Sequence, residues 1–244
     1  SGYKCCVMIV FNALLTVPII FFTDILREYV MRIISGFLFS LLSAPLLLTP
    51  QFANAEPVAE QQAEKNVLAI VLKTRVTRAD VMPSEKERKE IKAQAKESYG
   101  EMLNYLIRVN ASNKIYELVL NDYAAQKGIT LNQALVSKFT EKFSDQFSGE
   151  GTSKSIEEIA AKQVMQYQAE KAMFKEFGGR VIFRQSNPQM PIDAYKALLS
   201  GYRESGQLQI VDKDLEDAFW SVFTPPFQYE IAPENIDFSQ PWWI

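Results

Sequence analysis

The sequence has no histidine in its 244 residues, and its only two cysteines are adjacent, at Cys5 and Cys6. The absence of histidine excludes imidazole-based acid/base catalysis, Ser-His-Asp and Cys-His nucleophiles, and metal sites that need an imidazole ligand. Two neighbouring cysteines form neither a CxxC redox pair nor a four-cysteine metal site. We therefore expect no catalytic residue, no cofactor and no bound metal.

An excess of positive charge is also missing, since 26 Lys and Arg face 29 Asp and Glu for a formal net charge of −3. This balance argues against a nucleic-acid partner. Neither phosphate-loop pattern, GxGxxG or GxxxxGKS/T, occurs, and Gly178-Gly179 follows a predicted helix, where glycine ends it. The carboxylate pairs Glu157/Glu158 and Asp212/Asp214 stand at predicted helix starts, where negative charge is favourable.

Long apolar runs occur only in the first 50 residues. Met31 and Arg32 give a short positive start, Ile33 to Leu48 form an apolar run, and Ala53-Asn54-Ala55 supplies the small residues that a signal peptidase inspects. Residues 31–55 are therefore predicted to be a signal peptide cleaved after Ala55, which makes the mature protein periplasmic. The alternative is an uncleaved protein anchored in the inner membrane through residues 1–50.

Residues 1–30 begin with Ser and contain a second apolar stretch, Val7 to Phe22, interrupted by Asn12 and Pro18. We favour the interpretation that translation was read from upstream of a true start at Met31, so that this segment is not made. The alternative is a transmembrane helix paired with residues 33–48, for which the stretch is slightly short.

The polar residues 56–66 are predicted to be a flexible lead-in, and residues 67–244 a single, mainly α-helical domain with a few short strands. Capping signals and apolar spacing predict the helices, with capping boxes at three of their starts: Ser84 with Glu87, Thr130 with Gln133, and Ser155 with Glu158. The helix over residues 99–127 is expected to break near residues 110–113, and further helices to begin at Pro191 and Asp214.

Short β-branched runs predict strands at Val67–Leu72, Arg75–Val76, Arg180–Arg184 and Leu208–Val211. We expect Val67–Leu72 to pair with Arg180–Arg184, which would join the two halves of the chain in one domain. We also expect an apolar groove between the helices over residues 99–127 and 156–177.

The stretch from residue 219 onward is rich in aromatic side chains. In one interpretation it folds back over an apolar groove of the helical body; in the other it is an exposed patch that binds a partner or an unfolded chain. The candidate partner-binding residues are Phe219, Trp220, Phe223, Phe227, Tyr229, Trp242 and Trp243.

Residues 67–140 resemble the N-terminal region of SurA-type periplasmic chaperones, a layout shared by parvulin-type prolyl isomerases. The likeness rests on the strand at Val67–Leu72, the phrase Val76-Thr77-Arg78-Ala79-Asp80, the long charged helices, and Gly128-Ile129-Thr130 before a further helix. Leu72-Lys73-Thr74 stands where that family commonly has an Asn-Gly or Asp-Gly turn. The resemblance implies a SurA-N-like helical domain with chaperone-like binding. It does not imply prolyl isomerisation, because the parvulin core contains histidine.

Together these features predict an exported, non-catalytic module that binds extended or unfolded envelope polypeptides. Two alternatives belong to other classes. One is a structural accessory subunit of an envelope complex, and the other is an envelope hydrolase that uses carboxylates and Tyr, which would need acids converging in a pocket with raised pKa.

Overall fold

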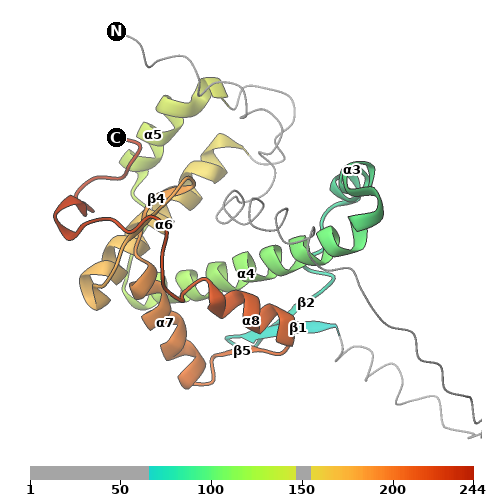
Figure 1. Cartoon of the computed structure of the whole chain (residues 1–244). Coiled ribbons are helices and arrows are strands. Elements are labelled where there is room, and N and C mark those ends of the chain that lie inside the picture. The colour runs from blue at the N-terminus through green and yellow to red at the C-terminus, as the bar shows by residue number, and fades with distance from the viewer. Residues whose placement is uncertain (1–65, 147–154) are drawn as a thin grey trace, which may run out of the picture.

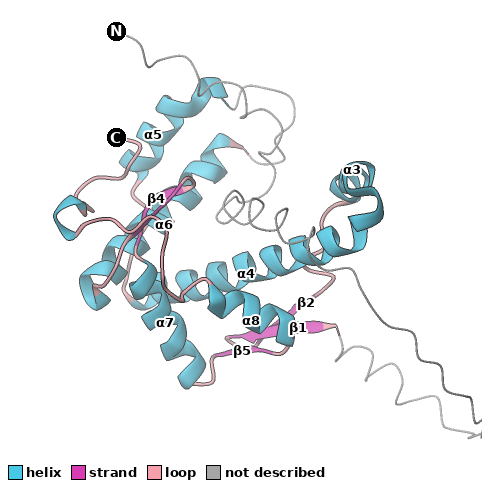
Figure 2. Ribbon diagram, in the orientation of Figure 1, coloured by secondary structure: helices cyan, strands magenta, loops and turns pink. Residues whose placement is uncertain are grey.

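The structure is a computed structural model that describes residues 66–146 and 155–244. The described part is mainly α-helical with a few short strands, as the sequence predicts (Figures 1 and 2). The expectations for residues 1–30 and for the signal peptide at residues 31–55 lie outside the described residues, as does the lead-in at residues 56–66 except for Asn66. Within that part of the chain, none of the helices has the length and apolar character needed to cross a bilayer.

The longest helices, α4 and α6, form the frame on which the other elements pack. Figure 1 shows α4 running along the molecule, with α3 at one end, α8 and the β1-containing sheet beside it, and α5 and α6 toward the other end. The α-helices are α3 (Glu85–Ala95), α4 (Tyr99–Gln126), α5 (Gln133–Phe143), α6 (Ile156–Phe177), α7 (Ile192–Glu204) and α8 (Lys213–Ser221).

Two of the three predicted capping boxes are confirmed. Ser84 at α3 and Ser155 at α6 each accept a hydrogen bond from the main chain three residues on, and the glutamate at that position bonds back. The third was wrong, because α5 is capped by Asn132, whose Oδ1 accepts from Ala134 N and Leu135 N. Asn132 lies two residues closer to the helix than Thr130 does.

The predicted break in α4 was also wrong, since the helix is continuous from Tyr99 to Gln126. The polar side chains in the suspected break are satisfied without interrupting the backbone. Asn110 Nδ2 donates to Val81 O at 3.0 Å, and Ser112 Oγ donates to Arg108 O at 2.9 Å, one turn back. Packing of the neighbouring Ala111 and Ile115 in the core therefore decides the conformation.

A three-stranded antiparallel sheet has the order β2–β1–β5, formed by β1 (Val67–Val71), β2 (Thr74–Thr77) and β5 (Leu208–Ile210). The expected partner of the first strand was therefore wrong: Ala69 pairs with Ile210 and Val71 with Leu208. The predicted strand near residue 182 instead forms a hairpin with β4, through β3 (Ile182–Arg184) and β4 (Asn187–Met190). Leu72 and Lys73 make the β1–β2 turn with positive φ angles of 52° and 69°.

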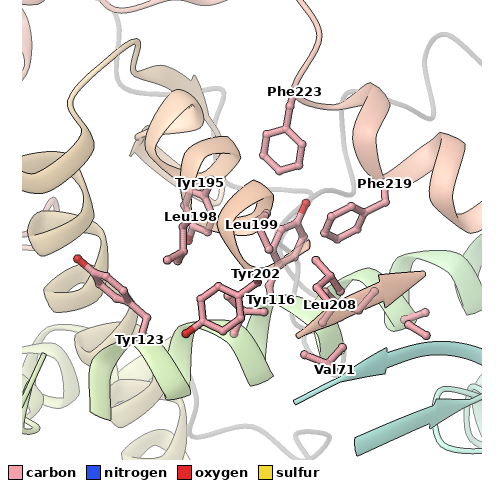
Figure 3. Close-up of a cluster of buried hydrophobic side chains, with 14 of the residues drawn as sticks. Val71, Tyr116, Tyr123, Tyr195, Leu198, Leu199, Tyr202, Leu208, Phe219 and Phe223 are labelled. Carbon is pink, nitrogen blue, oxygen red and sulfur yellow. The ribbon is translucent and has the colours of Figure 1, made fainter. Parts of the chain in front are cut away.

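The buried side chains form two separate clusters. The main core joins the three-stranded sheet to α4, α7 and α8, and Figure 3 shows its aromatic centre around Tyr116, Phe219 and Phe223. The second cluster is small and consists of Phe139, Ala160, Val164 and Trp243, from α5, α6 and the end of the described chain. The candidate functional site described below is built around this second cluster.

Candidate functional site

Three of the seven aromatic residues singled out from the sequence are buried. Phe219 and Phe223 are each 1 % exposed in the main core, where Phe219 stacks on Tyr116 with ring centroids 5.1 Å apart (Figure 3). Trp243 is 2 % exposed in the second cluster. In this conformation these three side chains contribute to packing and present no surface to a partner.

The other four lie at the surface to different degrees. Trp220 and Phe227 are half-buried and lie beneath arginines: Arg203 is 5.3 Å from the Trp220 ring, and Arg180 is 5.0 Å from the Phe227 ring. Tyr229 is 49 % exposed and Trp242 is 46 % exposed. The structure thus buries Trp243 and leaves Trp242 exposed, although the two residues are of the same type and adjacent in the sequence.

Residues 236–244, called the 236–244 segment below, contain neither α-helix nor β-strand and pack against α5, α6 and β4. Side chains of the body hydrogen-bond its main chain at four places. Gln189 Nε2 donates to Asp237 O at 2.8 Å, and Asp237 N donates to Gln189 Oε1 at 2.7 Å. Tyr167 Oη donates to Phe238 O at 2.8 Å, Lys171 Nζ to Ser239 O at 3.4 Å, and Lys142 Nζ to Trp243 O at 2.7 Å.

Aromatic contacts anchor the same segment. Trp243 meets Phe139 and Tyr167 edge to face, with ring centroids 5.4 Å and 5.8 Å apart. Phe238 lies on Phe174 at 4.8 Å, and Trp242 covers Phe143 at 5.9 Å. We call the surface formed by the α5 and α6 side chains under this segment the α5–α6 surface. The side chains of this surface hydrogen-bond backbone atoms of the 236–244 segment and pack against its aromatic rings.

A buried carboxylate lies behind the 236–244 segment. Glu170 of α6 is 4 % exposed, and its Oε1 accepts three hydrogen bonds: from Gln166 Nε2 at 2.9 Å, from Asn187 Nδ2 at 2.7 Å and from Tyr195 Oη at 2.6 Å. Burial raises the pKa of Glu170 to about 7, against the opposing effect of these donors. The network ties α6, β4 and α7 together at one oxygen atom.

A recess of about 20 Å³ lies between Glu170 and the 236–244 segment. That volume holds about one water molecule. Asp237 lines the same recess, and hydrogen bonds from Ser239 lower the pKa of Asp237. Glu170 therefore faces amides and a phenol in a space too small for a substrate, an arrangement that fits a structural carboxyl group better than a hydrolase site.

A second, open recess of about 220 Å³ lies where the sequence predicts an apolar groove, between α4, α6 and the loop before α3. Its lining combines apolar surface with polar and charged side chains, and the predicted apolar groove stays a prediction. The apolar contribution comes from Val81, Met82 and Pro83, and the polar and charged side chains are Asp80, Glu87, Asn110, Asn113, Lys114, Glu117 and Lys162. Lys114 and Lys162 both pair with Glu117, at 3.1 Å and 3.6 Å.

Within the described residues, no cluster of three or more His, Cys, Asp or Glu side chains could hold a metal ion. Comparisons of the chain with protein-family models, with curated proteins and with solved structures gave no match. The case for a function therefore rests on the geometry of the α5–α6 surface.

Sequence reasoning missed the residues that hold the 236–244 segment: Lys142, Tyr167, Lys171 and Gln189. Each is a common surface residue type in a position with no motif around it. Phe139 and Phe143 do lie on the expected apolar face of their helix, but that spacing does not reveal what covers the face.

Proposed function

We propose that the chain is a non-catalytic module that binds polypeptide segments lacking regular structure. One observation carries the proposal: the α5–α6 surface, together with Gln189 of β4, already holds such a segment, residues 236–244, through hydrogen bonds to its backbone and seats for its aromatic rings. Backbone bonds do not depend on sequence, and pockets for side chains add selectivity. This combination suits a protein that meets many extended or unfolded chains.

The proposed place of action is the periplasm, with envelope proteins as the bound polypeptides. The supporting features are the signal-peptide pattern over residues 31–55 and the resemblance of residues 67–140 to SurA-type N-terminal regions. Sequencing the N-terminus of the protein isolated from its native cell tests the location. A mature chain that starts at Glu56 supports export, and a retained apolar segment supports the membrane-anchored alternative.

Suppression of aggregation tests the binding function directly. An outer-membrane β-barrel protein is diluted from denaturant with and without a stoichiometric excess of this protein, and light scattering is recorded. We expect protection that weakens in Phe143→Ala, which removes a ring of the α5–α6 surface, and persists in Phe183→Ala. Phe183 is a suitable control because it is 49 % exposed on β3, outside that surface. No protection by the unaltered protein would refute the proposal.

The structural accessory subunit remains the second candidate. The Arg180–Asp193 pair and the Phe227 and Tyr229 region form a surface with charged and aromatic groups that a fixed partner could cover. Affinity purification under native conditions separates the two. A single partner at a fixed stoichiometry favours the accessory subunit, whereas substoichiometric binding of many envelope proteins favours the module proposed here.

A further inference from the structure

We propose that the 236–244 segment occupies its own chain's ligand site, and that the preferred external ligand is an irregular polypeptide segment that places a phenylalanine in the seat of Trp243. This inference rests on the proposed function and specifies its ligand. We infer the ligand class from how Trp243 fits its seat. Its ring packs closely against the surrounding side chains, but one of its polar groups has no hydrogen-bond partner among the described residues.

The seat of Trp243 is aromatic and apolar. Phe139, Ala160 and Val164 surround the indole, and Tyr167 meets its edge. The main-chain carbonyl of Trp243 accepts a bond from Lys142, so the residue is held by both its backbone and its ring. Any segment with an aromatic side chain at this position could form the same contacts.

The indole N–H of Trp243 is the flaw in the fit. Its Nε1 is buried and has no hydrogen-bond partner among the described residues. A buried Trp N–H usually finds an acceptor, and leaving one unpaired lowers affinity about fivefold to a hundredfold. A phenyl ring has no such donor and gives up about fivefold in affinity through its smaller apolar area. The balance favours phenylalanine over tryptophan in this seat.

Because Trp243 occupies the seat, the 236–244 segment competes with an external ligand for the same site. A ligand binds only the fraction of molecules in which the 236–244 segment has left, so its apparent affinity falls by that fraction. A polypeptide with a better-fitting ring displaces the segment, whereas one without an aromatic residue does not. The segment would thereby select among the unfolded chains that the protein meets.

The test uses the full chain and a fluorescein-labelled nine-residue peptide with the sequence of residues 236–244, but with Phe in place of the second Trp. Binding is measured by fluorescence anisotropy for the unaltered protein and for Trp243→Ala, Trp243→Phe and Phe183→Ala. Phe183 is the control, because it is an aromatic residue that is 49 % exposed on β3, outside the α5–α6 surface and the 236–244 segment. Circular dichroism confirms that each variant is folded.

Emptying the seat in Trp243→Ala should strengthen peptide binding at least about tenfold. Trp243→Phe improves the fit of the internal segment, so it should weaken peptide binding about fivefold. This variant tests the inference if Trp243→Ala does not fold. Phe183→Ala should stay within about twofold of the unaltered protein. Versions of the peptide with Trp or Ala in the seat position should bind more weakly than the Phe version, in that order.

Four results would overturn the inference. Equal affinity across the Trp243 variants would mean that the peptide binds elsewhere, which leaves the proposed function standing. A peptide with Trp that binds as well as the one with Phe would remove the argument from the N–H group. An unaltered protein that is a dimer and becomes monomeric on adding peptide would assign the seat to a second copy. Absence of binding to every variant, with no protection against aggregation, would refute the proposed function as well.

Discussion

The carboxyl group of Glu170 lies inside the helical body, with uncharged donors on three different elements directed at one oxygen. Burial favours the protonated acid, and the pKa of about 7 is above the ordinary value of 4.5. The folded protein therefore binds a proton between these two values that the unfolded chain releases. Stability from this group is present below pH 4.5 and is lost as the pH rises toward 7.

Glu170→Gln should flatten that part of the pH profile. The unaltered protein loses on the order of 3 kcal/mol through this group between pH 4.5 and 7, because each pKa unit corresponds to about 1.4 kcal/mol. Gln keeps an acceptor oxygen and has no charge to bury, so the variant should equal the unaltered protein near pH 5 and exceed it at pH 8. Urea unfolding at both pH values measures the difference, and parallel profiles would contradict this assignment.

Trp242 and Trp243 are adjacent and identical in the sequence but differ in burial, at 46 % and 2 % exposed. Trp243→Ala should lower the free energy of unfolding by about 3 kcal/mol, because it empties a packed site. Trp242→Ala should change it by about 0.5 kcal/mol or less. Thermal and urea unfolding measure both values. Equal destabilisation by the two substitutions would mean that Trp243 is not the anchor of the second cluster.

Helix starts are the elements in which the sequence was most informative. The capping boxes at Ser84 and Ser155 consist of contacts over three residues, so the local sequence specifies them. Thr130 also matches that pattern, but Asn132 caps α5 with two bonds and Gln168 binds the main chain on either side of that turn, through Asn132 N and Thr130 O. A contact from α6, distant in sequence, thus helps to choose between two plausible local caps.

Substitution of the two candidate caps tests this choice. Asn132→Ala should destabilise the protein by about 1 kcal/mol, because it removes the acceptor for two main-chain N–H groups at the start of α5. Thr130→Ala, at an exposed position, should cost less than about half of that. Chemical unfolding provides the comparison, and a larger effect at Thr130 would restore the cap expected from the sequence.

The β1–β2 turn adopts a left-handed backbone with side chains that disfavour it. Lys73 is exposed and has a φ angle of 69°. Lys73→Gly should stabilise the protein by up to about 1 kcal/mol, since the relief of left-handed strain exceeds the added entropy of the unfolded chain. Lys86→Gly within α3 is the matched control and should destabilise by about 1 kcal/mol. The turn geometry would be contradicted if both substitutions destabilised equally in urea unfolding.

Strand partners show where sequence reasoning stops. The run Val67–Val71 is recognisable as a strand by composition, but its partner Leu208–Ile210 is chosen by burial of Val71 and Leu208 in one core. A strand near residue 182 has an equally suitable composition, and it pairs instead with β4, which contains Pro188 and was not expected. Pairing between distant segments depends on the packed whole, which single-strand composition does not encode.

At the scale of the whole molecule, the late part of the chain completes both clusters. β5 and α8 lie beside β1 and α4 and close the main core (Figure 1). Trp243 closes the second cluster between α5 and α6. The many aromatic residues from residue 219 onward therefore have two roles. Phe219 and Phe223 build the core, while the 236–244 segment covers the surface that we propose binds polypeptides.

Photo-crosslinking tests that central claim most directly. A photoreactive phenylalanine analogue is placed at Phe143 or, in a separate protein, at Phe183, and the sample is irradiated while a denatured outer-membrane protein is diluted into it. Phe143 contacts the ring of Trp242 on the α5–α6 surface, and Phe183 lies on β3. The account predicts a crosslink to the unfolded protein from position 143 and little from position 183. Crosslinking from 183 alone, or from neither position while aggregation is still suppressed, would contradict it.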